Sequence, residues 1–210
     1  MKRVLVTGLA GFVGHHVGEG ILKNTDWHLV GLDRLDVSGT LHRLKDIEIW
    51  DSVKDRISFV WHDLKAPINE FVAEKIGAVD MIFHLAAATH VDRSIINPME
   101  FVLDNVVATC NLLDFARALK TVEKIFYFST DEVFGPAQKH DYQEWDRYKS
   151  SNPYAATKAG GEELSIAFEN TYKLPVVITH CMNVFGERQH VEKFIPLVIK
   201  KILQGERIFI

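Results

Sequence analysis

Three glycines near the N-terminus constrain the fold of this chain more than any other feature. In the run VLVTGLAGFVG, Gly8, Gly11 and Gly14 follow an aliphatic segment and precede an amphipathic one, which indicates a strand, a tight turn and a helix. Glycine at such a turn lets the backbone approach a pyrophosphate, and the helix N-terminus offers it unpaired N–H groups. Glycines that merely pack a helix are the alternative, but the order of the three elements favours a dinucleotide site.

The rest of the chain alternates short aliphatic runs with longer amphipathic ones. Strands are predicted at residues 3–7, 28–33, 57–62, 81–85, 124–130 and 176–180, and helices at 12–23, 68–76, 98–120, 152–172 and 192–204. Strand runs such as MIFHL and KIFYF lack polar alternation, which is typical of a parallel sheet covered by helices on both faces. The pattern therefore predicts an α/β fold with a doubly wound parallel sheet of the Rossmann type.

Composition narrows the possible partners. The net charge is -4 and basic residues are interspersed with acidic ones, which argues against nucleic acid. No apolar run approaches the roughly 18 residues of a membrane span and no signal-peptide pattern is visible, so we expect no membrane partner and a cytoplasmic location. Cys110 and Cys181 lack metal or redox spacing and are interpreted as buried thiols, and the ten histidines lack the spacing of metal ligands, so no metal is expected.

Acidic residues follow the second and third predicted strands. Asp33 lies about 20 residues after the glycine turn, where a carboxylate accepts hydrogen bonds from ribose hydroxyls, and this favours NAD over NADP. The adjacent Arg34 leaves NADP open, because an arginine there could bind a 2′-phosphate. Asp63 is placed to reach the adenine edge, or is a solvated turn aspartate.

Candidate reactive groups follow the fifth predicted strand. Tyr154 and Lys158 in YAATK lie one helical turn apart and share a face, so the ammonium, with a positive nicotinamide ring, could lower the pKa of the tyrosine. Thr130, Asp131 and Glu132 come at the end of the strand, and the two acids could address different atoms of one substrate. A polar strand cap is the alternative for these residues.

Several runs together resemble a known family: TGLAGFVG, HLAAATHVDRSI, FSTDEVFG, NPYAATKAGGE and NVFGERQHVEKFIPLVI. They resemble the extended short-chain dehydrogenases of the NAD-dependent epimerase/dehydratase type, and within these the dTDP-glucose 4,6-dehydratases. The likeness covers essentially the whole chain, and STDEVFG followed by YAATK is its most specific part. In related 4-epimerases and decarboxylases the residues that match Asp131 and Glu132 usually differ, so this pair favours a dehydratase.

The resemblance implies a reaction in three steps on one nucleotide sugar. Tyr154 would take the O4 proton while a hydride passes from C4 to NAD, Glu132 and Asp131 would eliminate water across C5 and C6, and the hydride would return to C6. Thr130 would orient the sugar or the tyrosine, and Lys158 would also hold the nicotinamide ribose. A nucleotide-sugar 4-epimerase and a non-catalytic NAD-binding module remain alternative functions.

Further positions are carried over from the family by likeness. The expected cofactor-binding residues are Gly8, Gly11, Phe12, Val13, Gly14, Asp33, Asp63, Leu64, Leu85, Ala86, Ala87, Tyr154 and Lys158. The expected substrate-binding residues are Thr89 and His90, near the hexose, and Asn183, near the phosphates. The run HCMN at 180–183 departs from the polar residues that related dehydratases often have there.

Two expectations concern the larger organisation. Residues 1–180 are expected to form the NAD-binding domain and 181–210 the beginning of a smaller substrate-binding domain, with the polar stretch 136–151 as a loop and a truncated end at Ile210. The resemblance also implies a homodimer built on a four-helix interface of the helices that begin near Pro98 and Asn152. Apolar positions on these helices permit it, unless they face the sheet: Val102, Val106, Leu113, Leu164 and Phe168.

Overall fold

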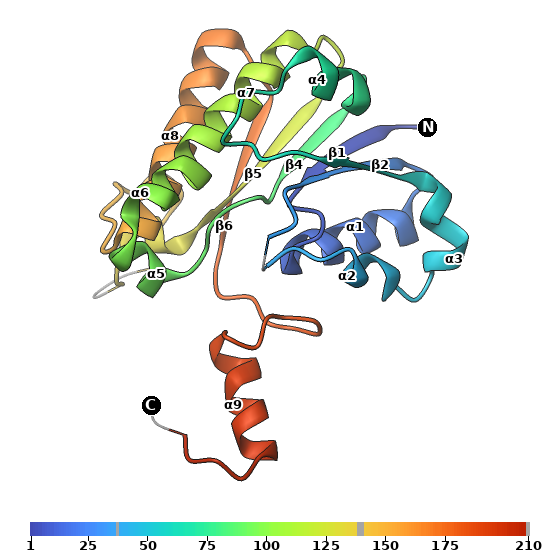
Figure 1. The fold of residues 1–210 in the computed structure, drawn as a ribbon. Coiled ribbons are helices and arrows are strands. Elements are labelled where there is room, and N and C mark those ends of the chain that lie inside the picture. The colour runs from blue at the N-terminus through green and yellow to red at the C-terminus, as the bar shows by residue number, and fades with distance from the viewer. Residues whose placement is uncertain (37, 138–140, 209–210) are drawn as a thin grey trace.

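A parallel six-stranded sheet forms the centre of the protein, whose computed structural model describes residues 1–36, 38–137 and 141–208 (Figure 1). The strands are β1 (Arg3–Thr7), β2 (His28–Asp33), β3 (Ile57–Trp61), β4 (Met81–His84), β5 (Lys124–Thr130) and β6 (Val176–Cys181). Their order in the sheet is β3-β2-β1-β4-β5-β6. The chain reverses its direction of winding between β1 and β4, so the doubly wound fold expected from the sequence is confirmed.

Helices cover both faces of this sheet (Figure 1). One face carries α1 (Phe12–Asn24), α2 (His42–Lys45) and α3 (Trp50–Val53), and the other carries α4 (Glu70–Ile76), α7 (Ala108–Ala118) and α8 (Pro153–Tyr172). Side chains of β1 alternate between them: Val4 and Val6 pack in the first core, and Leu5 packs in the second. This alternation follows from the two-residue period of a strand and explains why strand runs are apolar throughout.

The helix expected at 98–120 is one rod in which a π-helical segment lies between two α-helical ones. It consists of α6 (Pro98–Phe101), a π-helical segment η2 (Val102–Val107) and α7. The sequence also gave no sign of α2, α3, the 3₁₀ turn η1 (Lys54–Arg56) or α5 (Val91–Ile96). These elements have three to six residues, too short for a clear apolar period.

Residues of the expected dimer helices divide between the core and the surface. Leu113 is buried in the core, and Leu164 and Phe168 pack against it, so for these three residues the alternative that they face the sheet is correct. Val102 is exposed and Val106 is partly buried. The apolar face left open on this rod instead includes Met99, Val102 and Leu103.

The C-terminal segment leaves the sheet after β6 (Figure 1). It forms α9 (Phe194–Leu203), whose apolar side chains, among them Phe194, Ile199 and Leu203, are exposed. The expected loop 136–151 contains only turns and bends where it is described, and residues 138–140 lie outside the described residues. Within the described part of the chain, no helix is long and apolar enough to cross a membrane.

Candidate functional site

The glycine turn connects β1 to α1 at the point where the sheet reverses its winding. Gly8 has a φ of 70° and donates its N–H to Leu32 O at 2.8 Å. A Cβ atom at Gly14 would lie 2.0 Å from Gly8 O, so the start of the helix contacts the turn too closely for any side chain. Gly11 is the N-cap of α1 and no side chain caps this end, so the first N–H groups of the helix, including those of Phe12 and Val13, are available to a phosphate.

The residues after β4 lie beside this turn. Leu85 and Ala86 both donate their N–H groups to Thr7 Oγ1 at 3.2 Å, and Ala87 follows them. A Cβ atom at Gly8 would lie 2.8 Å from Ala86 N, which shows how closely the two segments approach. The structure therefore brings this part of the expected cofactor site together at the carboxyl ends of β1 and β4.

Asp33 connects the end of β2 to the glycine turn. Its carboxylate accepts the N–H of Ala10 at 3.0 Å and that of Leu35 at 2.9 Å. The side chain is 9% exposed, and burial raises its pKa. A carboxylate has about four acceptor positions, so Asp33 keeps positions for ribose hydroxyls.

Asp63 begins a turn, and its contact with the adenine edge stays a prediction. Its Oδ1 accepts the N–H of Lys65 at 3.0 Å, and its Oδ2 lies 3.4 Å from Lys65 Nζ. Leu64 beside it is buried, and its carbonyl accepts from Asn111 Nδ2 at 2.7 Å. The turn is thereby fixed between β3 and α7.

The acidic pair Asp131 and Glu132 lies just beyond β5, in a 3₁₀ turn, η3 (Asp131–Phe134). Their different directions therefore come from this turn and not from strand alternation, which corrects the sequence interpretation. Thr130, the last residue of β5, accepts the N–H of Glu132 at 3.3 Å and donates to Asp131 Oδ1 at 3.3 Å. Asn152 Nδ2 donates to Glu132 Oε2 at 3.1 Å.

Tyr154 lies opposite this turn on α8. The helix begins after Asn152, whose side chain accepts the N–H of Ala155, and Pro153 occupies its first position. Tyr154 is 8% exposed, and burial together with the charge of Glu132 raises its pKa to about 12. A hydrogen bond with Thr130 acts in the opposite direction. The tyrosine hydroxyl, Thr130 and Glu132 thus belong to one cluster.

Lys158 is buried one helical turn beyond Tyr154. Its Nζ donates to Phe128 O on β5 at 2.5 Å, and burial lowers its pKa to about 8. Without a bound nicotinamide ring, burial and the nearby carboxylates raise the pKa of Tyr154. The lowering expected from the ammonium together with a bound nicotinamide ring stays a prediction.

The expected substrate residues divide into two groups. Thr89 and His90 lie between β4 and α5, and the buried Nδ1 of His90 has no partner among the described residues. Asn183 is exposed two residues after β6. Lys193 was not singled out from the sequence. Its Nζ donates to Thr89 O at 3.3 Å. Burial lowers the pKa of Lys193, while the charges of Glu192 and Glu132 act in the opposite direction. Lys193 could have been found from its place in VEKFIP, part of a run that carries the family resemblance.

A buried polar network behind the site also went unnoticed in the sequence. His84 at the end of β4 joins Thr7 Oγ1 at 2.8 Å to Thr109 Oγ1 at 2.9 Å. Asn105 accepts the N–H of Ala88 at 2.8 Å and donates to Thr157 Oγ1 at 3.0 Å. These bonds connect β1, β4, the π-helical rod and α8 beneath the candidate site.

Two smaller expectations concern cysteines and metals. Cys110 lies in α7 and Cys181 ends β6, and both thiols are free and only partly buried, which corrects the expectation of buried thiols. Among the residues that the structure describes, no three His, Cys, Asp or Glu side chains gather closely enough to hold a metal ion.

Known proteins share this sequence and fold. A family model described as GDP-mannose 4,6 dehydratase matches residues 5–210. The dTDP-glucose 4,6-dehydratase of Neisseria gonorrhoeae is 37% identical over 98% of this chain and 61% of its own length. The dTDP-D-glucose 4,6-dehydratase of Mus musculus is 37% identical over 98% of this chain and 57% of its own. The chain thus spans less than two thirds of these relatives.

Two solved structures are similar as well. The dTDP-glucose 4,6-dehydratase DesIV of Streptomyces venezuelae, solved with NAD and TYD bound, superposes with a TM-score of 0.87 at 35% identity, over 97% of this chain and 62% of its own. A UDP-N-acetylglucosamine 4-epimerase of Methanobrevibacter ruminantium superposes with a TM-score of 0.87 at 28% identity, over all of this chain and 65% of its own. The resemblance seen in the sequence is confirmed.

Proposed function

The chain belongs to the GDP-mannose 4,6 dehydratase family, and from that premise we propose that it carries the catalytic centre of an NAD-dependent nucleotide-sugar 4,6-dehydratase. The observation that carries the proposal is the cluster of Tyr154 with Thr130, Asp131 and Glu132, because it combines a proton acceptor for an alcohol with two carboxylates for an elimination. An epimerase has no use for such a pair of acids.

The residues around the glycine turn fit a dinucleotide. The open N-terminus of α1 suits the pyrophosphate, and the carboxylate of Asp33 suits the adenosine ribose. When bound, NAD would supply a reversible hydride acceptor. Lys158 would hold the nicotinamide ribose with its ammonium, which already points to the carboxyl end of β5.

Each step then has a group of this chain to serve it. Tyr154 takes the O4 proton of the sugar, and Thr130 orients the tyrosine hydroxyl through their hydrogen bond. Glu132 removes the C5 proton, and Asp131 donates a proton to the departing C6 hydroxyl. Both carboxylates lie in one short turn, so they can reach adjacent carbons of the same ring.

The substrate proposed is a nucleotide sugar. Thr89 and His90 would contact the hexose, and Asn183 would contact the phosphates. The ammonium of Lys193, which donates to Thr89 O, adds a hydrogen-bond donor on the hexose side of the site. In the same proposal, residues 1–180 form the cofactor domain, and residues 181–210, with the exposed apolar side chains of α9, begin a substrate-binding domain.

Mass spectrometry of reaction products tests this function. The protein is incubated with NAD and each of dTDP-glucose, UDP-glucose and GDP-mannose. A dehydratase produces a sugar nucleotide lighter by one water, whereas a 4-epimerase leaves the mass unchanged. An epimerised product of unchanged mass, with no dehydrated one, would contradict the proposal in favour of the epimerase.

We also propose a homodimer and a cytoplasmic location. The exposed Met99, Val102 and Leu103 on the rod of α6 and η2 offer an apolar face for a second copy. The free thiols of Cys110 and Cys181 suit a reducing compartment.

A further inference from the structure

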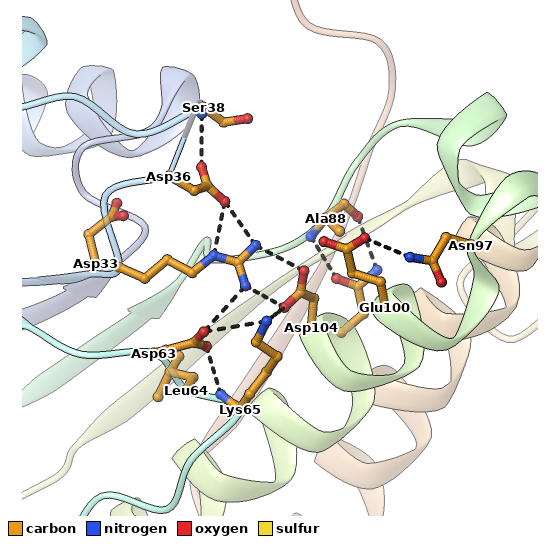
Figure 2. Close-up of polar contacts among 12 residues, drawn as sticks. Asp33, Asp36, Ser38, Asp63, Leu64, Lys65, Ala88, Asn97, Glu100 and Asp104 are labelled. Carbon is orange, nitrogen blue, oxygen red and sulfur yellow. Dashed lines mark hydrogen bonds and ion pairs between the residues drawn. The ribbon is translucent and has the colours of Figure 1, made fainter.

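Arg34, the residue directly after β2, is held by three carboxylates, one from its own loop and two from other segments. Its Nη1 and Nη2 donate to the two carboxylate oxygens of Asp104 at 2.6 and 2.9 Å. Its Nε donates to Asp36 Oδ2 at 2.9 Å, and Asp63 Oδ2 lies 3.7 Å from Nη1. Figure 2 shows Asp36, Asp63 and Asp104 converging from the loop after β2, the turn after β3 and the rod of η2. Every nitrogen of the guanidinium therefore has a carboxylate beside it.

Among the three carboxylates that contact Arg34, that of Asp104 is the most buried. It is 6% exposed, and its two parallel hydrogen bonds form the strong bidentate arrangement of an arginine and a carboxylate. These bonds raise the pKa of Arg34, so the guanidinium stays charged and in place. Lys65 Nζ also lies 3.7 Å from Asp104 Oδ1.

The charges around this pair sum to a negative total. Four carboxylates and three cations lie around the carboxyl ends of β2 and β3, so the sum is negative: Asp33, Asp36, Asp63, Asp104, Arg34, Lys65 and Arg43, whose charge interacts with that of Asp33. A free arginine beyond β2 is the residue type that binds a phosphate on the 2′-oxygen of adenosine. Here the arginine is occupied, and the surrounding carboxylates repel a further phosphate.

We infer that Asp104 sets the preference for NAD over NADP, because it occupies the arginine that would otherwise bind the 2′-phosphate. The inference rests on the proposed dinucleotide binding and adds a specificity-determining residue that lies 70 positions from Arg34 in the sequence. It also removes the reason for which the sequence leaves NADP open at Arg34.

The experiment compares dissociation constants for NAD and NADP, measured by calorimetry on the full chain. Asp104→Asn keeps the shape of the side chain and removes its charge, so affinity for NADP relative to NAD should rise about tenfold. Asp51→Asn is the matched control, since this side chain on α3 is 94% exposed and removes the same charge elsewhere. The control should leave the ratio unchanged.

Two further variants keep the test independent of how well Asp104→Asn folds. Asp36→Asn removes the more exposed partner of Arg34 and should raise relative NADP affinity by a smaller factor, about threefold. Arg34→Gln combined with Asp104→Asn should abolish the gain, because the freed guanidinium is its source. Thermal unfolding is a second measurement: the nucleotide that binds a variant more tightly should raise its unfolding temperature more.

The possible failures are distinguishable. If the unmodified chain binds NAD and the ratio stays the same in a folded Asp104→Asn variant, the inference about Asp104 is overturned while the proposed function stands. A gain that persists without Arg34 overturns it as well. If the unmodified chain binds neither nucleotide, the proposed cofactor and this inference both fail.

Discussion

The backbone N–H of Tyr154 donates to the hydroxyl of Ser94 at 3.1 Å, so the first turn of α8 is bonded to α5. Ser94 is fully buried and donates in turn to Val91 O. The first N–H groups of a helix have no acceptor within the helix, and this hydroxyl supplies one. The contact fixes the candidate catalytic tyrosine relative to the segment that follows β4.

Ser94→Ala should therefore lower the free energy of unfolding by about 1–3 kcal/mol, because it leaves a buried N–H without an acceptor. Urea denaturation measures the loss. Ser52→Ala, on the exposed side of α3, is the control and should change stability by less than about 0.5 kcal/mol. Equal effects of the two substitutions would contradict the role given to Ser94.

Two glycines of α1 should respond in opposite ways to alanine. At Gly14 the added Cβ would lie 2.0 Å from a backbone oxygen of the turn, whereas at Gly20 it meets nothing within 4 Å. Gly14→Ala should disrupt the turn and weaken dinucleotide binding, while Gly20→Ala should stabilise the protein by roughly 0.5–1 kcal/mol through its higher helix propensity. Thermal unfolding and NAD titration of both variants check this, and normal NAD binding by Gly14→Ala would contradict it.

His84 should make the protein sensitive to acid. Burial lowers its pKa to about 3 from the usual 6.5, so the folded state holds the neutral imidazole and the unfolded state takes up a proton below pH 6.5. The contribution of His84 to the free energy of unfolding is fully present above pH 6.5. It is lost as the pH falls toward 3, with a slope approaching about 1.4 kcal/mol per pH unit. Denaturation midpoints between pH 7 and 4.5 should fall less steeply for His84→Gln. An identical slope in both proteins would count against the prediction.

Different residues should serve the first and second chemical steps. With a nucleotide sugar that the protein converts, Glu132→Gln should still allow hydride transfer from C4, so NADH absorbance should appear and persist. Tyr154→Phe should show none, because nothing else takes the O4 proton. Tyr172→Phe, at the exposed end of α8, is the control and should behave like the unmodified protein. Identical behaviour of Glu132→Gln and Tyr154→Phe would refute the assignment of roles.

The proposed dimer makes a prediction about mass in solution. Light scattering at micromolar concentration should give twice the chain mass, and Leu103→Arg should shift it to the monomer, because a charge would be buried in the interface. Phe71→Arg changes an exposed apolar side chain on α4 and should leave the dimer intact. A monomer mass for the unmodified chain would exclude the proposed interface.

The sequence predicts the sheet better than the connections. All six strands were placed to within one residue at either end, because an apolar run in a parallel sheet is a strong local signal. The short helices α2, α3 and α5 are set by tertiary packing: Leu44 and Val53, for example, complete the core beside α1. No local pattern contains that information.

Partners that lie far apart in the sequence were beyond such reasoning. Arg34 could be identified beside the cofactor site, but its partner Asp104 reads as an ordinary helix residue until the rod packs against the end of β2. The same holds for Lys193, which reaches Thr89 across 104 positions. The spacing of the three glycines and that of Tyr154 and Lys158 could be recognised because each set lies within a few residues of sequence.

The π-helical segment η2 gives two neighbouring residues separate tasks. Asp104 reaches toward the nucleotide-binding half of the sheet, and Asn105 holds Ala88 and Thr157 in the half that carries the candidate catalytic residues. The two halves of the site are thus tied together by one peptide unit, since the side chains of adjacent residues anchor η2 to Arg34 on one side and to Ala88 and Thr157 on the other.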